Sequence, residues 1–162
     1  MKKKVILIIG ACGTIGSELS KRISNKYQII LVDKNTKKLN QLKKIFTKNN
    51  VMTFSGDITK NKTIDKLLSS SVKKYSKIDA VVFCAYPKSP NYGSKFENLK
   101  ENFLREDLYN QLGSLIIFCQ KISRFFLKFK AGNIIFISSI QGLAAPKFDH
   151  YVNLKMTSPI EY

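Results

Sequence analysis

The sequence predicts a three-layer α/β fold in which a doubly wound parallel sheet lies between two layers of helices. First, five short apolar, β-branched runs alternate along the chain with stretches whose apolar residues recur every three or four positions. That alternation is typical of repeated strand–helix–strand units. Second, a glycine-rich turn separates the first run from the helix that follows it. Because there is no repeat, low-complexity tract or linker, we expect one domain over residues 1–162.

Three strand–helix pairs make up the first half of the chain. Continuous apolar runs predict strands over residues 4–9, 27–32 and 51–54, each buried on both faces. The spacing of the apolar residues then predicts a helix after each strand. The residues expected to face the core from these three helices are Ile15, Leu19, Ile23, Leu39, Leu42, Ile45, Phe46, Ile64, Leu67, Leu68, Val72 and Tyr75.

The second half adds two strands and one long helix. Strands are expected over 78–84 and 133–137, with Ser138 and Ser139 directly after the second of them. Prolines and a glycine predict a loop over 85–99. An apolar stripe predicts a continuous helix over roughly 100–130, which Gly132 is expected to end. The stripe comprises Leu104, Leu108, Leu112, Leu115, Ile116, Cys119, Ile122, Phe126 and Phe129.

The chain is strongly basic, with 28 Lys and Arg against 11 Asp and Glu and a net charge of +17. Such an excess is typical of proteins that bind nucleic acid or anionic membranes. Only Arg22, Arg105 and Arg124 are arginines, however, whereas readers of bases and phosphates usually rely on arginine. The lysines are also spread along the whole chain. We therefore expect general use of lysine on the surface, with neither a nucleic acid nor a membrane as partner.

The composition disfavours membrane insertion, secretion and metal binding. No apolar run approaches the roughly 18 residues of a membrane helix, and the apolar stretch after the N-terminal lysines is too short for a signal peptide. Cys12, Cys84 and Cys119 are widely spaced and odd in number, which argues against a disulfide framework. Because His150 is the only histidine, we expect no metal site, and the cysteines favour a reducing, cytoplasmic environment.

The glycine-rich turn reads Gly-Ala-Cys-Gly-Thr-Ile-Gly at 10–16. Because it follows a predicted buried strand and opens a helix, it has the context of a dinucleotide-binding turn of the Rossmann type. Gly10 would permit the tight turn, Gly13 the close approach of a pyrophosphate, and Gly16 the packing of helix against strand. The start of the helix, with Thr14 and Ile15, would offer free N–H groups to the phosphates.

Acidic residues follow the second and third strands. A carboxylate at Asp33 can accept hydrogen bonds from both ribose hydroxyls of an adenosine and would repel a 2′-phosphate. This favours NAD, although the neighbouring Lys34 leaves NADP open. Asp57 can either accept a hydrogen bond from an adenine amino group or cap the helix that follows it. The other residues expected to contact the nucleotide at the carboxyl ends of the strands are Ile58, Cys84 and Ala85.

These motifs resemble the short-chain dehydrogenase/reductase family. The resemblance rests on the glycine turn, Asp33, Gly-Asp-Ile-Thr at 56–59, Val-Phe-Cys-Ala at 82–85 and Gly-Asn-Ile-Ile-Phe-Ile-Ser-Ser at 132–139. Segments 85–88, 91–93, 145–148 and 156–162 are similar to the family's flagellin-modification oxidoreductases, which are associated with nonulosonic-type sugars of surface glycans. The resemblance implies NAD(P)-dependent hydride transfer on a sugar-like alcohol or ketone as a small-molecule substrate. For the full-length enzyme it also implies a homo-oligomer.

The resemblance further implies a catalytic Ser, Tyr and Lys. Ser139 matches the family serine by its place after the fifth strand. The acid/base tyrosine has two candidates, because Tyr151 has Lys155 four residues on, whereas Tyr162 matches the flagellin-modification segment. The Ser-Pro-Ile-Glu at 158–161 has the capping pattern of a helix start, and its proline would break a helix begun near Tyr151. We therefore favour Tyr162 over the pair of Tyr151 and Lys155.

The sequence departs from the family pattern in two ways. Gln111, beside Asn110, stands where many members have an Asn. A Lys four residues after Tyr162, and the later strands and helices of the family, would lie beyond the 162 residues. We therefore expect the amino-terminal part of a longer enzyme, able to bind nucleotide but inactive alone. The alternatives are a non-catalytic nucleotide-binding module and a basic nucleic-acid-binding protein. Cys12 could also carry a reactive thiolate at the helix start, although we favour packing within the turn.

Overall fold

The computed structural model describes residues 3–46 and 50–154. The chain divides into two compact units. The first, called the sheet unit below, comprises residues 1–85 and 116–137, and the second, called the loop unit, comprises residues 86–115 and 138–162. That the whole chain is one domain stays a prediction.

Five parallel strands form the sheet unit's centre. They are β1 (Val5–Ile9), β2 (Gln28–Asp33), β3 (Val51–Ser55), β4 (Ala80–Phe83) and β5 (Asn133–Phe136). Their order in the sheet is β3-β2-β1-β4-β5, and every neighbouring pair is parallel. The strand ends are in register, since Ile9 lies opposite both Val32 and Phe83, and Asp33 lies opposite Ser55. The carboxyl ends of four strands therefore meet at one edge.

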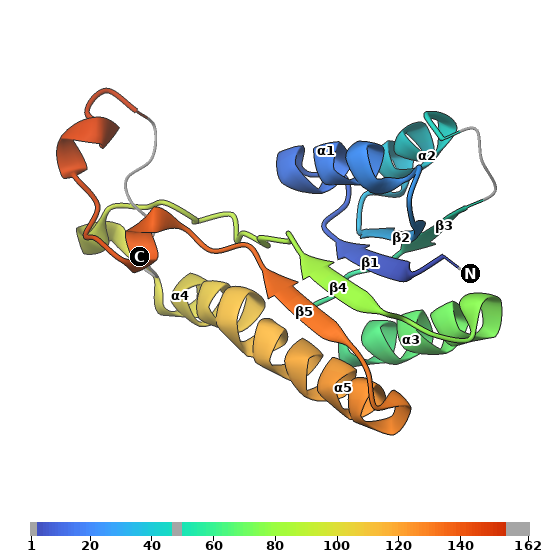
Figure 1. The fold of residues 1–162 in the computed structure, drawn as a ribbon. Helices are drawn as coiled ribbons and strands as arrows, with labels where there is room; N and C mark the ends of the chain where they lie inside the picture. The colour runs from blue at the N-terminus through green and yellow to red at the C-terminus, as the bar shows by residue number, and fades with distance from the viewer. Residues whose placement is uncertain (1–2, 47–49, 155–162) are drawn as a thin grey trace. The chain divides into compact units, whose positions relative to one another are not determined.

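Helices cover both faces of this sheet, which confirms the doubly wound arrangement. Figure 1 shows α1 (Thr14–Ile23) and α2 (Thr36–Lys44) over one face, and α3 (Asn61–Tyr75) and α5 (Ser114–Phe129) over the other. Strands β1 and β2 are buried almost completely between them. From α5, Phe118, Ile122 and Phe126 point into the core, and the Phe118 ring meets the edge of Phe83 at 5.2 Å between centroids.

The buried face of α1 differs from the predicted one. Gly16 and Ser20 are the buried residues of this helix, and Ile15 is 51% exposed. Leu19 and Ile23 pack against the core only partly buried. The reason is the close approach of helix to strand: the backbone of Gly10 lies against Gly16, and Ser20 Oγ donates a hydrogen bond to the Gly16 carbonyl at 2.6 Å. A large side chain could not occupy this face.

The helix expected over 100–130 is interrupted. It consists of α4 (Glu101–Leu108), a π-helical turn η2 (Tyr109–Gly113) and then α5. The extra residue per turn shifts the phase of the stripe, and the predicted core residues Leu112 and Ile116 are exposed. Leu108, which precedes this turn, is exposed as well. Phe118, which the stripe omitted, is fully buried.

Gly132 does not end this helix. Lys130 adopts the left-handed conformation, with φ of 51°, and the helix stops at Phe129. The glycine is needed for another reason: a Cβ at Gly132 would collide with the ring of Phe126. A lysine therefore fills the C-terminal position at which glycine is usual.

The loop unit holds α4, η2 and three short 3₁₀ turns, η1 (Phe96–Asn98), η3 (Ile140–Gly142) and η4 (Phe148–Tyr151). Segment 86–95 is irregular, as the prolines predicted. Its backbone is anchored at Ser89, whose N–H and Oγ–H both donate to the buried Asp107 carboxylate of α4 at 2.7 Å. Across the part of the chain that the structure describes, every helix is too short or too polar to span a bilayer.

Candidate nucleotide site

Gly10 and Gly16 make the turn between β1 and α1 possible. Gly10 has φ of 77°, in the left-handed region, and a Cβ there would lie 2.7 Å from the backbone of Ala85. A Cβ on Gly16 would overlap the carbonyl oxygen of Gly10. At Gly13 a Cβ would meet only that same oxygen, at 3.4 Å, so this position has room for a methyl group. Gly10 and Gly16 are thus required for folding, whereas Gly13 leaves the outer surface of the turn without side-chain atoms.

The first turn of α1 is open to an anion. Gly13 is the N-cap and supplies no side-chain cap, and the first turn contains no acidic residue. The first N–H groups of a helix lack partners within it, and they carry the positive end of the helix dipole. Thr14 and Ile15 are exposed beside these groups. This arrangement suits a phosphate or pyrophosphate group.

Asp33 joins the turn to the end of β2. Its Oδ2 accepts a hydrogen bond from the N–H of Cys12 at 2.9 Å, and its Oδ1 accepts one from the N–H of Asn35 at 2.9 Å. The carbonyl of Val32 accepts hydrogen bonds from Gly10 and Ala11. The carboxylate is therefore fixed beside the glycine turn, as a ribose-binding acid must be.

Asp57 is held by its own loop. Its Oδ1 accepts hydrogen bonds from the N–H of Thr59 at 3.0 Å and from Thr59 Oγ1 at 2.8 Å. The carboxylate does not cap α3, because Lys60 is the N-cap and forms no side-chain cap. Gly56 N–H donates to the carbonyl of Asp33, which places the loop after β3 next to the end of β2. Ile58 is buried in this loop.

The thiol of Cys12 is unsuited to be a nucleophile at neutral pH. Burial, followed by the charge of Asp33 and a hydrogen bond to it, raises the pKa of Cys12 from 9.0 to about 11, against a smaller lowering by Lys38. Burial also raises the pKa of Cys84. Cys12 thus stays protonated, which agrees with packing in the turn and not with a reactive thiolate.

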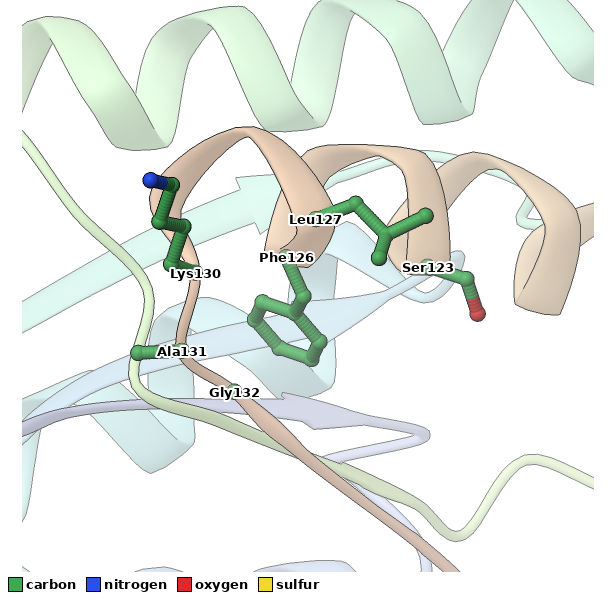
Figure 2. Close-up of a pocket in the computed structure, with 6 residues that line it drawn as sticks. All are labelled: Ser123, Phe126, Leu127, Lys130, Ala131 and Gly132. Atoms are coloured by element: carbon green, nitrogen blue, oxygen red, sulfur yellow. The ribbon is translucent and has the colours of Figure 1, made fainter.

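A recess of about 350 Å³ adjoins the turn between α1 and α2. It is lined by Cys12, Ser17, Lys21, Lys38, Gln41, Leu42 and Ile45. A second recess, of about 570 Å³, lies where α5 ends and β5 begins, and Figure 2 shows the ring of Phe126 beside Gly132 among the residues that line it. Because parallel strands share one direction, this second recess is at the amino end of β5, away from the carboxyl edge where the nucleotide turn lies. It is therefore no part of the nucleotide site.

The catalytic candidates belong to the loop unit. Ser139 is the N-cap of η3, and its Oγ accepts a hydrogen bond from the N–H of Gln141 at 3.2 Å. Tyr151 ends the short turn η4, and the chain leaves the helical conformation at Val152 and Asn153. Tyr162 and Lys155 lie outside the described residues. The choice between the two tyrosines, like the roles of the other site residues, stays a prediction.

Gln111 sits inside the π-helical turn. Both its Oε1 and its Nε2 are buried, and neither has a hydrogen-bond partner among the described residues. Buried amides are normally paired, and π-helical turns often occur at functional sites. That Gln111 stands where many family members carry Asn stays a prediction. Nothing in the pattern of apolar residues predicts the π-helical turn.

The hydrogen bonds between Ser89 and Asp107 are likewise not predicted by the sequence pattern. Asp107 is buried in the structure. An acidic residue on a buried face needs a partner. Spacing alone could not identify that partner, which lies 18 positions earlier in a loop.

Comparisons with known proteins agree with this geometry. A family model described as short chain dehydrogenase matches residues 4–155. Post-translational flagellin modification protein A of Campylobacter coli is 36% identical, over 100% of this chain and 65% of the relative. A short chain dehydrogenase structure from Bacillus anthracis has a TM-score of 0.82 at 20% identity, over 90% of this chain and 59% of that one. Another, from Leptospira borgpetersenii with bound NAD⁺, has a TM-score of 0.77 at 22% identity, over 92% and 56%.

The chain thus spans less than two thirds of the length of these relatives. The resemblance to the family and to its flagellin-modification members is confirmed by the family model and by the Campylobacter relative. The solved structures share the parallel sheet with helices on both faces. Because the family model covers nearly all of the sequence, the chain belongs to the short-chain dehydrogenase family.

Proposed function

We propose that this chain is the nucleotide-binding part of an NAD-dependent oxidoreductase that acts on a sugar-like alcohol or ketone. One observation carries the proposal: the Asp33 carboxylate is hydrogen-bonded into the glycine turn, so that the phosphate-binding and ribose-binding elements form one structure. The open amides of α1 would hold the pyrophosphate, and Asp33 would accept the ribose hydroxyls. When bound, the cofactor would supply the hydride chemistry.

The negative charge of Asp33 favours NAD over NADP. A carboxylate at Asp33 repels a 2′-phosphate. Lys21 and Lys38 in the neighbouring recess, together with Lys34, reduce that repulsion without removing the carboxylate. NAD is thus the expected cofactor, bound by Gly10, Gly13, Thr14, Ile15, Gly16, Asp33, Asp57, Ile58, Cys84 and Ala85.

For catalysis we propose Ser139 with Tyr162. Tyr151 is the only tyrosine of the chain with a lysine four residues on. That pair would need a continuous helical turn to share one face, and residues 152–154 do not form one. For residues 1–162 alone we accordingly expect nucleotide binding without steady turnover.

The biological setting is proposed from the relative in Campylobacter coli, whose name gives a role in flagellin modification. A pathway that attaches sugars to a surface protein fits a sugar-like substrate. The three cysteines form no disulfide among the described residues, which fits a cytoplasmic enzyme. Leu108, Tyr109 and Leu112 are exposed on the loop unit, and this supports a homo-oligomer for the full-length enzyme.

Titration with NAD, NADH and NADP by calorimetry tests the proposal. We expect saturable binding, with NAD tighter than NADP. Asp33→Asn should weaken NAD at least about tenfold, because a hydrogen bond to a charged group is lost. Asp65→Asn, at an exposed carboxylate of α3, is the matched control and should leave affinity unchanged. A folded chain that binds none of the three nucleotides would contradict the proposal.

A further inference from the structure

Lys88 lies between two tyrosines of the loop unit. Its Nζ is 4.3 Å from the ring centroid of Tyr92 and 5.6 Å from that of Tyr86. The two rings meet edge to face, with centroids 5.6 Å apart and planes at 87°. The hydroxyl of Tyr92 donates a hydrogen bond to that of Tyr86 at 3.2 Å. These residues are called the Tyr86–Lys88–Tyr92 cluster.

Hydrogen bonds made by Ser89 hold the backbone of this cluster in place. Ser89 donates two hydrogen bonds to the buried carboxylate of Asp107, and its own Oγ accepts one from the N–H of Asn91 at 3.2 Å. Prolines at 87 and 90 restrict the chain on both sides of Lys88. A loop that is ordered in advance loses less conformational entropy when a ligand binds. The ordered backbone would therefore reduce the entropic cost of binding a ligand at this cluster.

The positive charge of Lys88 is exposed. Among residues 3–46 and 50–154, Lys88 forms no ion pair with a carboxylate, and its side chain is exposed. The carboxylate of Asp107 in α4, to which this loop is anchored, is buried and already accepts two hydrogen bonds from Ser89. An ammonium group over aromatic rings still has N–H donors to offer. Such a group suits an incoming anion.

The chain places this loop directly after the end of β4. Ala85, whose backbone lies against Gly10 at the nucleotide turn, is followed at once by Tyr86. Ligands of open α/β sheets bind at the carboxyl ends of strands. The segment that leaves this edge is thus one from which substrate contacts are expected to come.

We propose that the Tyr86–Lys88–Tyr92 cluster recognises an oxyanion, a carboxylate or a phosphate, on a polyhydroxylated substrate. Lys88 would donate a charge-assisted hydrogen bond to the oxyanion. The rings of Tyr86 and Tyr92 would hold the Lys88 ammonium group in position for this contact. The inference rests on the proposed function, and it narrows the substrate class from sugar-like compounds to acidic ones.

Calorimetric titration of the 162-residue chain with D-glucuronate, D-glucose 6-phosphate and D-glucose tests this inference. We expect at least one acid to bind at least about tenfold more tightly than glucose, as one charge-assisted hydrogen bond provides. The two acids distinguish a carboxylate from a phosphate as the recognised group. Equal binding of all three sugars, or no saturable binding of either acid, overturns the inference.

Variants assign the effect to Lys88. Lys88→Met should remove the preference for the acid, and Lys88→Arg should retain it. Lys95→Met, at an exposed lysine of the same segment, is the matched control and should behave as the unaltered chain. A preference that persists in Lys88→Met overturns the assignment. NAD titrations of the same samples should be unaffected by Lys88→Met, so a failure of nucleotide binding and a failure of acid recognition are separate results.

Discussion

Gly16 and Gly13 differ in what a methyl group would meet. At Gly16 it would overlap the carbonyl of Gly10, whereas at Gly13 the nearest atom is 3.4 Å away. We predict that Gly16→Ala destabilises the fold by about 1–3 kcal/mol, the usual range for overpacking. Gly13→Ala should change stability little and still weaken NAD binding, because its methyl group would stand between the turn and the pyrophosphate. Thermal unfolding and NAD titration measure the two effects.

Cys12 gives a prediction in pH. Because its pKa is raised from 9.0 to about 11, its thiolate is about a hundredfold rarer at neutral pH than that of an ordinary thiol. Alkylation by iodoacetamide, followed by peptide mass spectrometry, should therefore be slow at pH 7. The rate should keep rising with pH until about 11. The denatured chain is the control, in which the rate should level off near 9. Rapid alkylation of the native chain at pH 7 would refute the assignment.

Two residues after the end of α5, Lys130 and Gly132, are expected to affect the free energy of unfolding in opposite directions when substituted. A left-handed residue other than glycine costs about 1–2 kcal/mol, so Lys130→Gly should raise the free energy of unfolding by about 1 kcal/mol. Gly132→Ala, two residues on, should lower it by about 1–3 kcal/mol, because its Cβ would displace the ring of Phe126. Chemical denaturation checks both. Opposite signs are therefore expected for two substitutions that lie two residues apart.

Most elements could be predicted because their signal is local. Each apolar run is a strand in the structure, and its ends differ from the prediction by at most two residues. The phase of a helix is harder to predict, because it depends on what the helix packs against. In α1 the contact with β1 admits only Gly16 and Ser20, so exposed Ile15 could not be distinguished from a core residue by spacing. In the long helix, a π-helical turn interrupts the stripe, so Leu112 and Ile116 are exposed although Ile122 and Phe126 are buried as predicted.

The candidate site was predictable to the same extent. The glycine turn and Asp33 are close in sequence and belong to one strand–helix–strand unit, so their proximity follows from topology. The anchor of Ser89 on Asp107 joins a loop to a helix across an intervening segment, and no periodicity encodes it. The tyrosine choice depends on the course of the chain after Tyr151, which local capping signals address only indirectly.

The whole molecule should not unfold uniformly. Strands β1 and β2 are flanked on both sides, and Leu7, Ile8, Ile29 and Ile30 are fully buried. Residues 138–154 form only short 3₁₀ turns and are mostly exposed. We predict that native-state hydrogen exchange is slowest in β1 and β2, and faster by orders of magnitude across 138–154. Mass spectrometry of peptic peptides would show this, and comparable protection of both regions would contradict it.

The hydrogen bonds of Asp33 reach further than the turn. Its Oδ1 holds the N–H of Asn35, and the side chain of Asn35 caps α2 by accepting a hydrogen bond from the N–H of Lys38 at 3.0 Å. A nucleotide that engaged this carboxylate would thus be thermodynamically linked to the order of a whole helix. Such linkage is reciprocal. The free energy by which a bound nucleotide stabilises α2 equals the free energy of binding that is lost when α2 is disordered. Residues of α2 that never touch a nucleotide would then help to set how tightly it is bound.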